Sequence, residues 1–314
     1  MIGRPWRSAG AVPSASPGGG GRRPPLERSG WGRTGTYPAV APGQVRPAVQ
    51  VPPEPMPLIR SGRPLKEWTY AGIFAPDLMI SAGRAQVGGV PQSFWAVWDR
   101  RRGVLETETL LVAARRVEVS DREMTVRSGP ARLEVAFTPV GDPVEVVSPH
   151  GRSYIWTRKT PVRADGHLTL GMEVRPVSAL GLLDQSAGYH ARVTEWEWSA
   201  GVGTTVDGWP VVWNLVRGIH DAESMSERTV WVDGHAVEAP PVRFAADLDE
   251  LWGDDGSLLC FEEEGARLQR IRLGLLSSDY VQPFGRFHGR LPGGVELSEH
   301  EPALGVMERH RARW

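Results

Sequence analysis

Cysteine, lysine and long hydrophobic runs are scarce in this chain of 314 residues, and each scarcity excludes a class of protein. Cys260 is the single cysteine, which excludes an intramolecular disulfide framework and a thiolate zinc site. It lies in the apolar run LLCF, where a buried, unreactive thiol is favoured over a nucleophile. No run approaches the roughly 18 apolar residues of a membrane span. The N-terminus also lacks the apolar core of a secretory signal, so we expect a cytoplasmic protein. The two lysines against many arginines indicate a bacterial, GC-rich genome.

Standard catalytic and cofactor motifs are also missing. The chain has no GxSxG elbow, no HExxH, no CxxC and no Walker phosphate loop. The eight histidines form no HxH or HxxxH pair, the usual spacing of metal ligands. We therefore expect no cofactor and no metal. The net charge of −1 gives no general attraction to nucleic acid, so we expect no nucleic-acid partner.

The composition changes near residue 56. Residues 1–56 are rich in proline and glycine and contain seven arginines against two glutamates. Such a segment buries too little apolar surface to offset its ordering entropy, and we predict a disordered tail. Met56 is an alternative start of the protein.

The rest of the chain has the pattern of an all-β protein. Apolar and polar residues alternate in runs of four to eight, rich in Val, Trp, Thr and Phe, which predicts strands. Pairs that suit tight hairpin turns separate many of these runs: Gly88-Gly89, Asp165-Gly166, Asp207-Gly208, Asp233-Gly234, Asp255-Gly256 and Gly293-Gly294. Successive hairpins imply antiparallel pairing. Short helical turns are an alternative at 177–184 and 245–252.

The length suggests two β lobes rather than one barrel. The body is longer than one eight-stranded barrel requires, and we place a break near residues 143–150. The prediction is a hairpin-rich, antiparallel protein with two lipocalin-like, or calycin-like, β-barrel lobes. The N-terminal lobe spans 57–148, and the C-terminal lobe spans 149–314 and carries the candidate pocket.

The segment from Asp184 to Gly203 is the most indicative of a site. Its Val, Thr and Trp residues predict a strand, in which alternate side chains share a face. One face would carry His190, Arg192, Thr194, Trp196 and Trp198. That mixture suits the wall of a pocket with aromatic surface and a few polar groups.

Polar residues in three other predicted strands are candidates for the same pocket. Arg158 and Lys159 lie in YIWTRK, and Asn214 stands alone among apolar neighbours. In the last strand Glu308 and His310 share a face, a couple suited to acid–base chemistry. The other face of that strand carries Met307 and three arginines and is predicted to meet solvent. Structural histidines, surface ion pairs and core tryptophans would explain the same residues without any function.

Several segments resemble the bacterial family known as domain of unknown function 2804. These are GRSYIWTRK, DQSAGYHARVTEWEWSAGVG, WNLVRGIHDAESMSERTVWVDG, QPFGRFHGRLPGGVEL and GVMERHRARW. The resemblance covers roughly residues 60–314 and implies recurrent polar positions at Arg158, Lys159, Asp184, His190, Arg192, Asn214, Glu227, Glu308 and His310. It implies no known activity. The strand pattern is also similar to the lipocalin-like double barrel of carotenoid hydratases, a likeness of fold alone.

Three functional hypotheses follow. The first is binding of a lipophilic small molecule, or its non-redox conversion by hydration, isomerisation or cyclisation. In that hypothesis Glu308 or Asp184 is the acid, His190 or His310 its partner, and Arg158 or Arg192 stabilises an anion. The second is a carbohydrate-binding or carbohydrate-active protein that uses tryptophan platforms and two carboxyls. The third is a structural or interaction module without a ligand.

Overall fold

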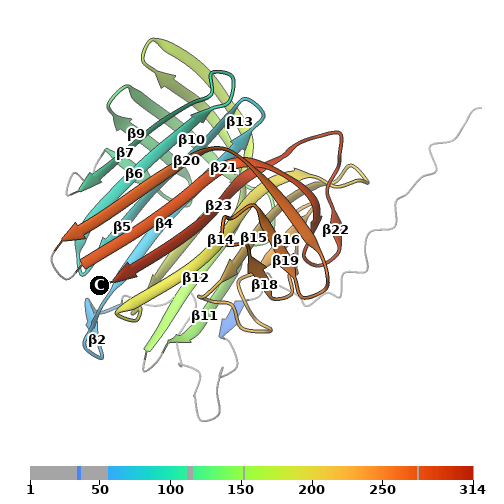
Figure 1. The fold of residues 1–314 in the computed structure, drawn as a ribbon. Coiled ribbons are helices and arrows are strands. Elements are labelled where there is room, and N and C mark those ends of the chain that lie inside the picture. The colour runs from blue at the N-terminus through green and yellow to red at the C-terminus, as the bar shows by residue number, and fades with distance from the viewer. Residues whose placement is uncertain (1–33, 37–55, 112–115, 151–152, 274–275, 314) are drawn as a thin grey trace, which may run out of the picture.

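The computed structural model describes residues 34–36, 56–111, 116–150, 153–273 and 276–313, and the account below concerns these residues (Figure 1). As predicted, the chain is all-β, and its strands pair antiparallel except where β1 (Thr34–Thr36) runs parallel to β11 (Val144–His150). The remainder of the predicted tail up to residue 55 lies outside the described residues. No helix of the described part has the length and hydropathy needed to cross a membrane.

Two large sheets and one small hairpin make up the fold. The first sheet has the order β7 (Val104–Leu111), β6 (Val90–Asp99), β5 (Leu78–Val87), β4 (Lys66–Ala75), β13 (Glu173–Gly188), β12 (Ser153–Leu170), β10 (Ala131–Pro139), β9 (Glu123–Ser128) and β8 (Val117–Val119). In addition, β11 pairs with β12, and β1 pairs with β11. The hairpin joins β2 (Ile59–Arg60) to β3 (Arg63–Pro64).

The second sheet contains the C-terminal part of the chain. Its order is β17 (His235–Glu238), β16 (Thr229–Val232), β15 (Pro210–Arg217), β14 (Val193–Thr204), β23 (Ala303–Arg313), β21 (Leu276–Leu291), β20 (Leu258–Leu273), β19 (Glu250–Gly253) and β18 (Val242–Phe244), with β22 (Val295–Glu296) beside β21. The fold is thus a two-lobed, calycin-like arrangement of curved antiparallel sheets.

Each sheet curls around an apolar core of its own and packs its other face against the partner sheet (Figure 1). Strand β4 illustrates the alternation: Ile73 faces the first lobe's core, whereas Tyr70 and Phe74 face the second sheet. On β15, Trp213 faces the second lobe's core and Val216 faces the first sheet. Central strands are therefore buried on both faces.

The first sheet extends across the break predicted near residues 143–150. Strands β12 and β13 lie at its middle, and the chain changes sheets between Gly188 and Val193. The division into lobes at 57–148 and 149–314 remains a prediction.

Most of the predicted hairpin turns are present. Gly88-Gly89 joins β5 to β6 and Asp233-Gly234 joins β16 to β17, with both residues of each pair at positive φ. Asp165-Gly166 is the exception, because it lies inside the 18-residue strand β12. There a side chain on Gly166 would collide with the carbonyl oxygen of Glu134 on β10. The alternative helical turn at 177–184 is also wrong, since it lies within β13.

Candidate functional site

A cavity of about 170 Å³ lies between the two sheets. Strands β4, β5, β6, β12 and β13 line one side of it, and β14, β15, β20, β21 and β23 line the other. Its wall is built largely of rings: Trp68, Tyr70, Phe94, Trp196, Trp198 and Tyr280. One water molecule needs about 10–15 Å³ of cavity volume, so the cavity has room for on the order of ten waters, or for a small organic molecule.

The predicted aromatic face of β14 meets this cavity. Trp196 stacks on Trp68 of the first sheet, with ring centroids 5.9 Å apart and planes 14° from parallel. Trp198 meets Tyr70 edge to face at 5.4 Å. Both tryptophans line the cavity, so this part of the wall joins the two sheets.

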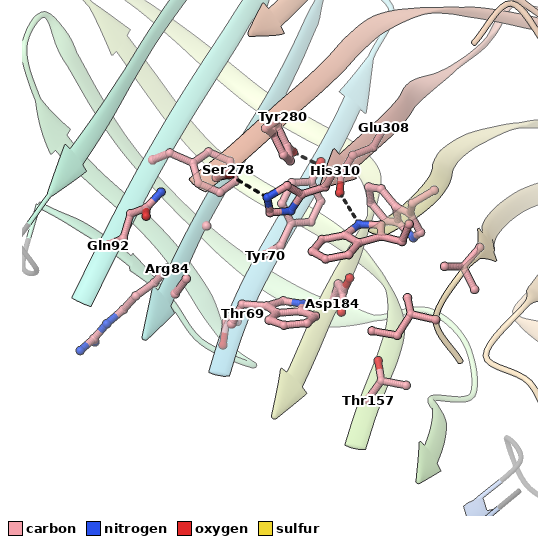
Figure 2. Close-up of a pocket in the computed structure, with 18 of the residues that line it drawn as sticks. Thr69, Tyr70, Arg84, Gln92, Thr157, Asp184, Ser278, Tyr280, Glu308 and His310 are labelled. Atoms are coloured by element: carbon pink, nitrogen blue, oxygen red, sulfur yellow. Dashed lines mark hydrogen bonds between the residues drawn. The ribbon is translucent and has the colours of Figure 1, made fainter. Parts of the chain in front are cut away.

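Glu308 is buried at the cavity wall and is held by three donors, and dashed lines mark two of these bonds in Figure 2. Its Oε1 accepts from Trp196 Nε1 at 2.8 Å, and its Oε2 accepts from the Tyr280 hydroxyl at 2.7 Å and from Gln282 Nε2 at 3.1 Å. Burial raises the pKa of Glu308, although the bonds from Tyr280 and Trp196 oppose the shift. The result is a fixed carboxyl that takes up a proton more readily than a solvated one.

His310 lies beside Glu308 on the same face of β23, as predicted. Its Nε2 is 2.8 Å from the hydroxyl of Ser278, and its ring packs edge-on against Trp196 and Tyr280 (Figure 2). Burial, with the charge of Arg267 adding to the shift, lowers the pKa of His310 to about 3. His310 is therefore a neutral imidazole at physiological pH, able to accept a proton only transiently.

A second polar group lines the cavity on the side of β12 and β13. Lys159 and Asp184 face each other across these strands, with Nζ and Oδ1 2.5 Å apart. Glu227, from the segment between β15 and β16, lies 3.4 Å from the same Nζ. All three side chains are buried and line the cavity.

Lys159 and Glu227, within this second group, differ in how readily they ionise. Burial would lower the pKa of Lys159, but Asp184 and Glu227 outweigh it and raise the pKa. Burial raises the pKa of Glu227 to about 7, with Lys159 opposing and Asp184 adding to the shift. Glu227 Oε2 has no hydrogen-bond partner among the described residues. The lysine thus stays charged, while Glu227 exchanges its proton near neutral pH.

His190 is buried behind the cavity wall rather than in it. Its ring lies 4.9 Å from Trp68 and 6.2 Å from His150. Burial, followed by the charge of Lys66, holds the pKa of His190 well below its usual value. Because Trp68 stacks on Trp196, which contacts His310, two aromatic rings separate His190 from His310.

The structure does not bring Arg158 and Arg192 to the cavity. Thr157 and Lys159 line the cavity, so Arg158 between them points to the opposite face of β12. Arg192 precedes β14 and is exposed. The geometry gives no support to their predicted ligand-binding roles.

Thr194 and Asn214 have contacts behind the wall. The hydroxyl of Thr194 donates to the carbonyl of Ala191 at 3.1 Å. Asn214 Oδ1 accepts from Trp198 Nε1 at 2.7 Å, and its Nδ2 donates to the Glu227 carbonyl at 2.9 Å. Asn214 therefore supports the orientation of Trp198 without lining the cavity.

The sequence analysis missed several lining residues: Trp68, Phe94, His220, Arg267 and Tyr280. The alternation of Ser278, Tyr280 and Gln282 along β21 carries the same signal as β14, a polar and aromatic face. Cys260, expected to be buried, is partly exposed, and burial raises the pKa of its thiol, as expected of an unreactive cysteine.

The chain belongs to the family described as domain of unknown function (DUF2804), which matches residues 113–314. This confirms the resemblance seen in the sequence. A search of the curated proteins finds no significant match.

Solved structures with similar folds include a putative AttH from Nitrosomonas europaea, at 14% identity and a TM-score of 0.48 over 87% of this chain and 98% of that one. Kievitone hydratase from Nectria haematococca has 9% identity and a TM-score of 0.47 over 79% and 88% of the two chains. CghA with Sch210972 has 11% identity and a TM-score of 0.42 over 78% and 87%. At these identities no activity transfers to this chain.

Proposed function

We propose that the cavity binds a lipophilic small molecule and converts it by non-redox acid–base chemistry, such as hydration, isomerisation or cyclisation. The observation that carries this proposal is the presence of two buried carboxyls with raised pKa values on one aromatic cavity. Glu308 contributes one from the second sheet, and Glu227 contributes the other beside Lys159. Buried carboxyls of this kind act as general acids or bases near neutral pH.

Each carboxyl has a defined environment for moving a proton. Glu308 shares a hydrogen bond with Tyr280, whose own pKa is raised well above its usual value by burial, so that the phenol stays protonated. Glu227 lies beside the fixed charge of Lys159, which stabilises the carboxylate after the proton has left. In this proposal Glu308 and Glu227 are the acid and base. Asp184 keeps Lys159 in place through their ion pair, and neutral His310 packs against the rings next to Glu308.

The lining supports a lipophilic ligand rather than a saccharide. Six rings and the aliphatic side chains of Val216 and Ile219 surround the polar groups, and the space lies between two packed sheets. A glycosidase needs an open groove in which two carboxyls flank the bond that breaks.

Native mass spectrometry of the purified protein tests the binding half of the proposal. We expect a co-purifying lipophilic molecule, and we expect a panel of such molecules to quench tryptophan fluorescence. Absence of both would overturn the proposal.

The catalytic half is tested by incubating the protein with its ligand in heavy water. Hydration or dehydration changes the ligand mass by one water, and isomerisation or cyclisation through a proton shift introduces deuterium. We expect Glu308→Gln and Glu227→Gln to abolish the change while binding persists, whereas Glu262→Gln, at an exposed carboxyl, leaves it intact. A ligand recovered unchanged from the unmodified protein would reduce the function to binding.

A further inference from the structure

Arg267 on β20 is a buried cation on the cavity wall whose charge no carboxylate matches at contact distance among the described residues. Its side chain is only 2% exposed. Its Nη2 donates to Thr109 Oγ1 at 3.0 Å and to Gln269 Oε1 at 2.9 Å, and both acceptors are neutral. The surroundings therefore hold the guanidinium in place without neutralising it.

Aromatic rings supply the rest of the immediate environment. The guanidinium carbon lies 4.1 Å from the centroid of Phe94 and 4.8 Å from that of Tyr280. A cation over a ring is stabilised by the negative face of that ring, and the stabilisation grows when water is excluded. Aromatic rings stabilise the guanidinium without neutralising it, so its charge stays available to an anion. A salt bridge would already have neutralised that charge.

Another buried arginine of the same chain shows what a purely structural arrangement looks like. Arg175 is also buried, but it donates to Asp99 and Asp77, each at 2.7 Å. This arginine has carboxylate partners and lies away from the cavity lining. Arg267 differs in both respects.

Glu308 does not take the role of a counterion at contact distance. It lines the same cavity, but its oxygens accept from Trp196, Tyr280 and Gln282. Burial also raises its pKa, which favours the neutral acid. A protonated Glu308 leaves Arg267 as the charged group at this end of the cavity.

We infer that Arg267 binds the carboxylate of an amphiphilic ligand whose apolar part lies against the tryptophans of the cavity. The planar guanidinium matches the geometry of a carboxylate, and such charge-assisted bonds strengthen where water is excluded. This inference rests on the proposed function of the cavity and narrows its ligand to a lipophilic acid.

The test compares decanoate with decan-1-ol at neutral pH, followed by quenching of tryptophan fluorescence in the unmodified protein. The two ligands share a chain and differ in the head group, so their ratio of dissociation constants reports the contribution of the charge. We expect decanoate to bind at least about tenfold more tightly, a difference of about 1.4 kcal/mol. Equal affinities would overturn the inference and leave the lipophilic cavity standing, whereas binding of neither ligand would overturn both.

Variants assign the preference to Arg267. Arg267→Gln should bring the two affinities within about twofold, Arg267→Lys should retain part of the preference, and Arg270→Gln, at an exposed arginine on the same strand, should leave it unchanged. Persistence of the preference in Arg267→Gln would assign it to another cation and overturn the inference. If Arg267→Gln does not fold, the lysine variant decides: it must lower the preference for decanoate.

Discussion

Trp196 and Glu308 are joined by a hydrogen bond across neighbouring strands, although 112 positions separate them in the chain. The register pairs Trp196 with His310 and Trp198 with Glu308, so the indole reaches diagonally to the carboxyl. This contact fixes an aromatic wall and a proton-carrying group in one geometry. Displacement of either strand would disturb both.

Replacing Trp196 with Phe tests the value of this hydrogen bond. The variant keeps a ring but removes the donor, so the pKa of Glu308 should rise further and the ionised form should become less favourable. We expect a loss of about 1–2 kcal/mol in the free energy of unfolding at pH 8. The loss should be smaller at pH 5, because a raised pKa makes the protonated form of Glu308 more populated there than at pH 8.

Urea denaturation at the two pH values measures the effect, and Trp209→Phe, at a partly exposed indole, is the matched control. The smaller ring also leaves a gap, but that penalty does not depend on pH. A loss that is the same at both pH values would mean that the ionisation of Glu308 in the folded protein does not change between pH 5 and pH 8.

Glu227 should make the protein less stable as the pH rises from about 4.5 towards 7. Its pKa is about 7 in the folded state and 4.5 ordinarily, so the unfolded chain releases the proton first. Stabilisation is thus complete below the ordinary pKa and lost as the pH passes the folded value. Glu227→Gln removes this dependence, and we expect it to gain about 2 kcal/mol relative to the unmodified protein between pH 5 and pH 8.

The measurement is the free energy of unfolding of Glu227→Gln minus that of the unmodified protein, taken at each pH. Glu195→Gln, at an exposed carboxyl, is the control. A constant difference would show that Glu227 has no raised pKa and would remove one of the two proposed proton carriers.

Lys159→Met should lower the free energy of unfolding far more than the loss of an exposed ion pair does. It leaves Asp184 and Glu227 buried near each other without a cation, and we expect a loss of about 3–5 kcal/mol in the free energy of unfolding. Adding Asp184→Asn should restore a large part, because the orphaned charge is then gone. Arg127→Met breaks an exposed pair with Glu134 and should change stability by at most about 1 kcal/mol. A double variant no more stable than Lys159→Met would contradict the buried ion pair.

Local pattern was sufficient to predict most strands and hairpins, and which side chains share a face within β14 and β23. The single strand predicted from Asp184 to Gly203 is wrong, because β13 ends at Gly188 and β14 begins at Val193, which leaves His190 and Arg192 in the connection between the two sheets. Alternation decides which side chains share a face, so the placement of Trp196 and Trp198 together, and of Glu308 with His310, needs no knowledge of the tertiary structure. Asp165-Gly166 shows the limit of turn chemistry. Long strands β10, β12 and β13 pass closely there, and the glycine serves close packing instead of a turn.

What the sequence could not predict is which faces are covered by the other sheet. Met307 was expected in solvent with its neighbouring arginines, but it is fully buried because that face of β23 covers the second lobe's core. For the same reason the sequence did not indicate that Arg267 lines the cavity. Its position depends on the packing of β20 against Phe94 and Thr109 of the first sheet. Packing between sheets is non-local, so no period in the sequence reports it.

His310 should make the protein sensitive to acid, opposite in sign to the effect of Glu227. Its pKa falls from 6.5 to about 3 on folding, so below pH 6.5 the unfolded chain binds a proton that the folded protein excludes. Stabilisation is present above 6.5 and is lost as the pH falls towards 3. His310→Gln removes this titration and leaves a polar group for Ser278. Between pH 7 and pH 4 we expect the unmodified protein to lose about 3 kcal/mol relative to the variant, measured by urea denaturation.

His300→Gln, at an exposed histidine, should follow the unmodified protein. If His310→Gln and the unmodified protein lose stability in parallel, His310 is accessible to protons in the folded state, and the wall beside Glu308 is open to water rather than closed by the two sheets.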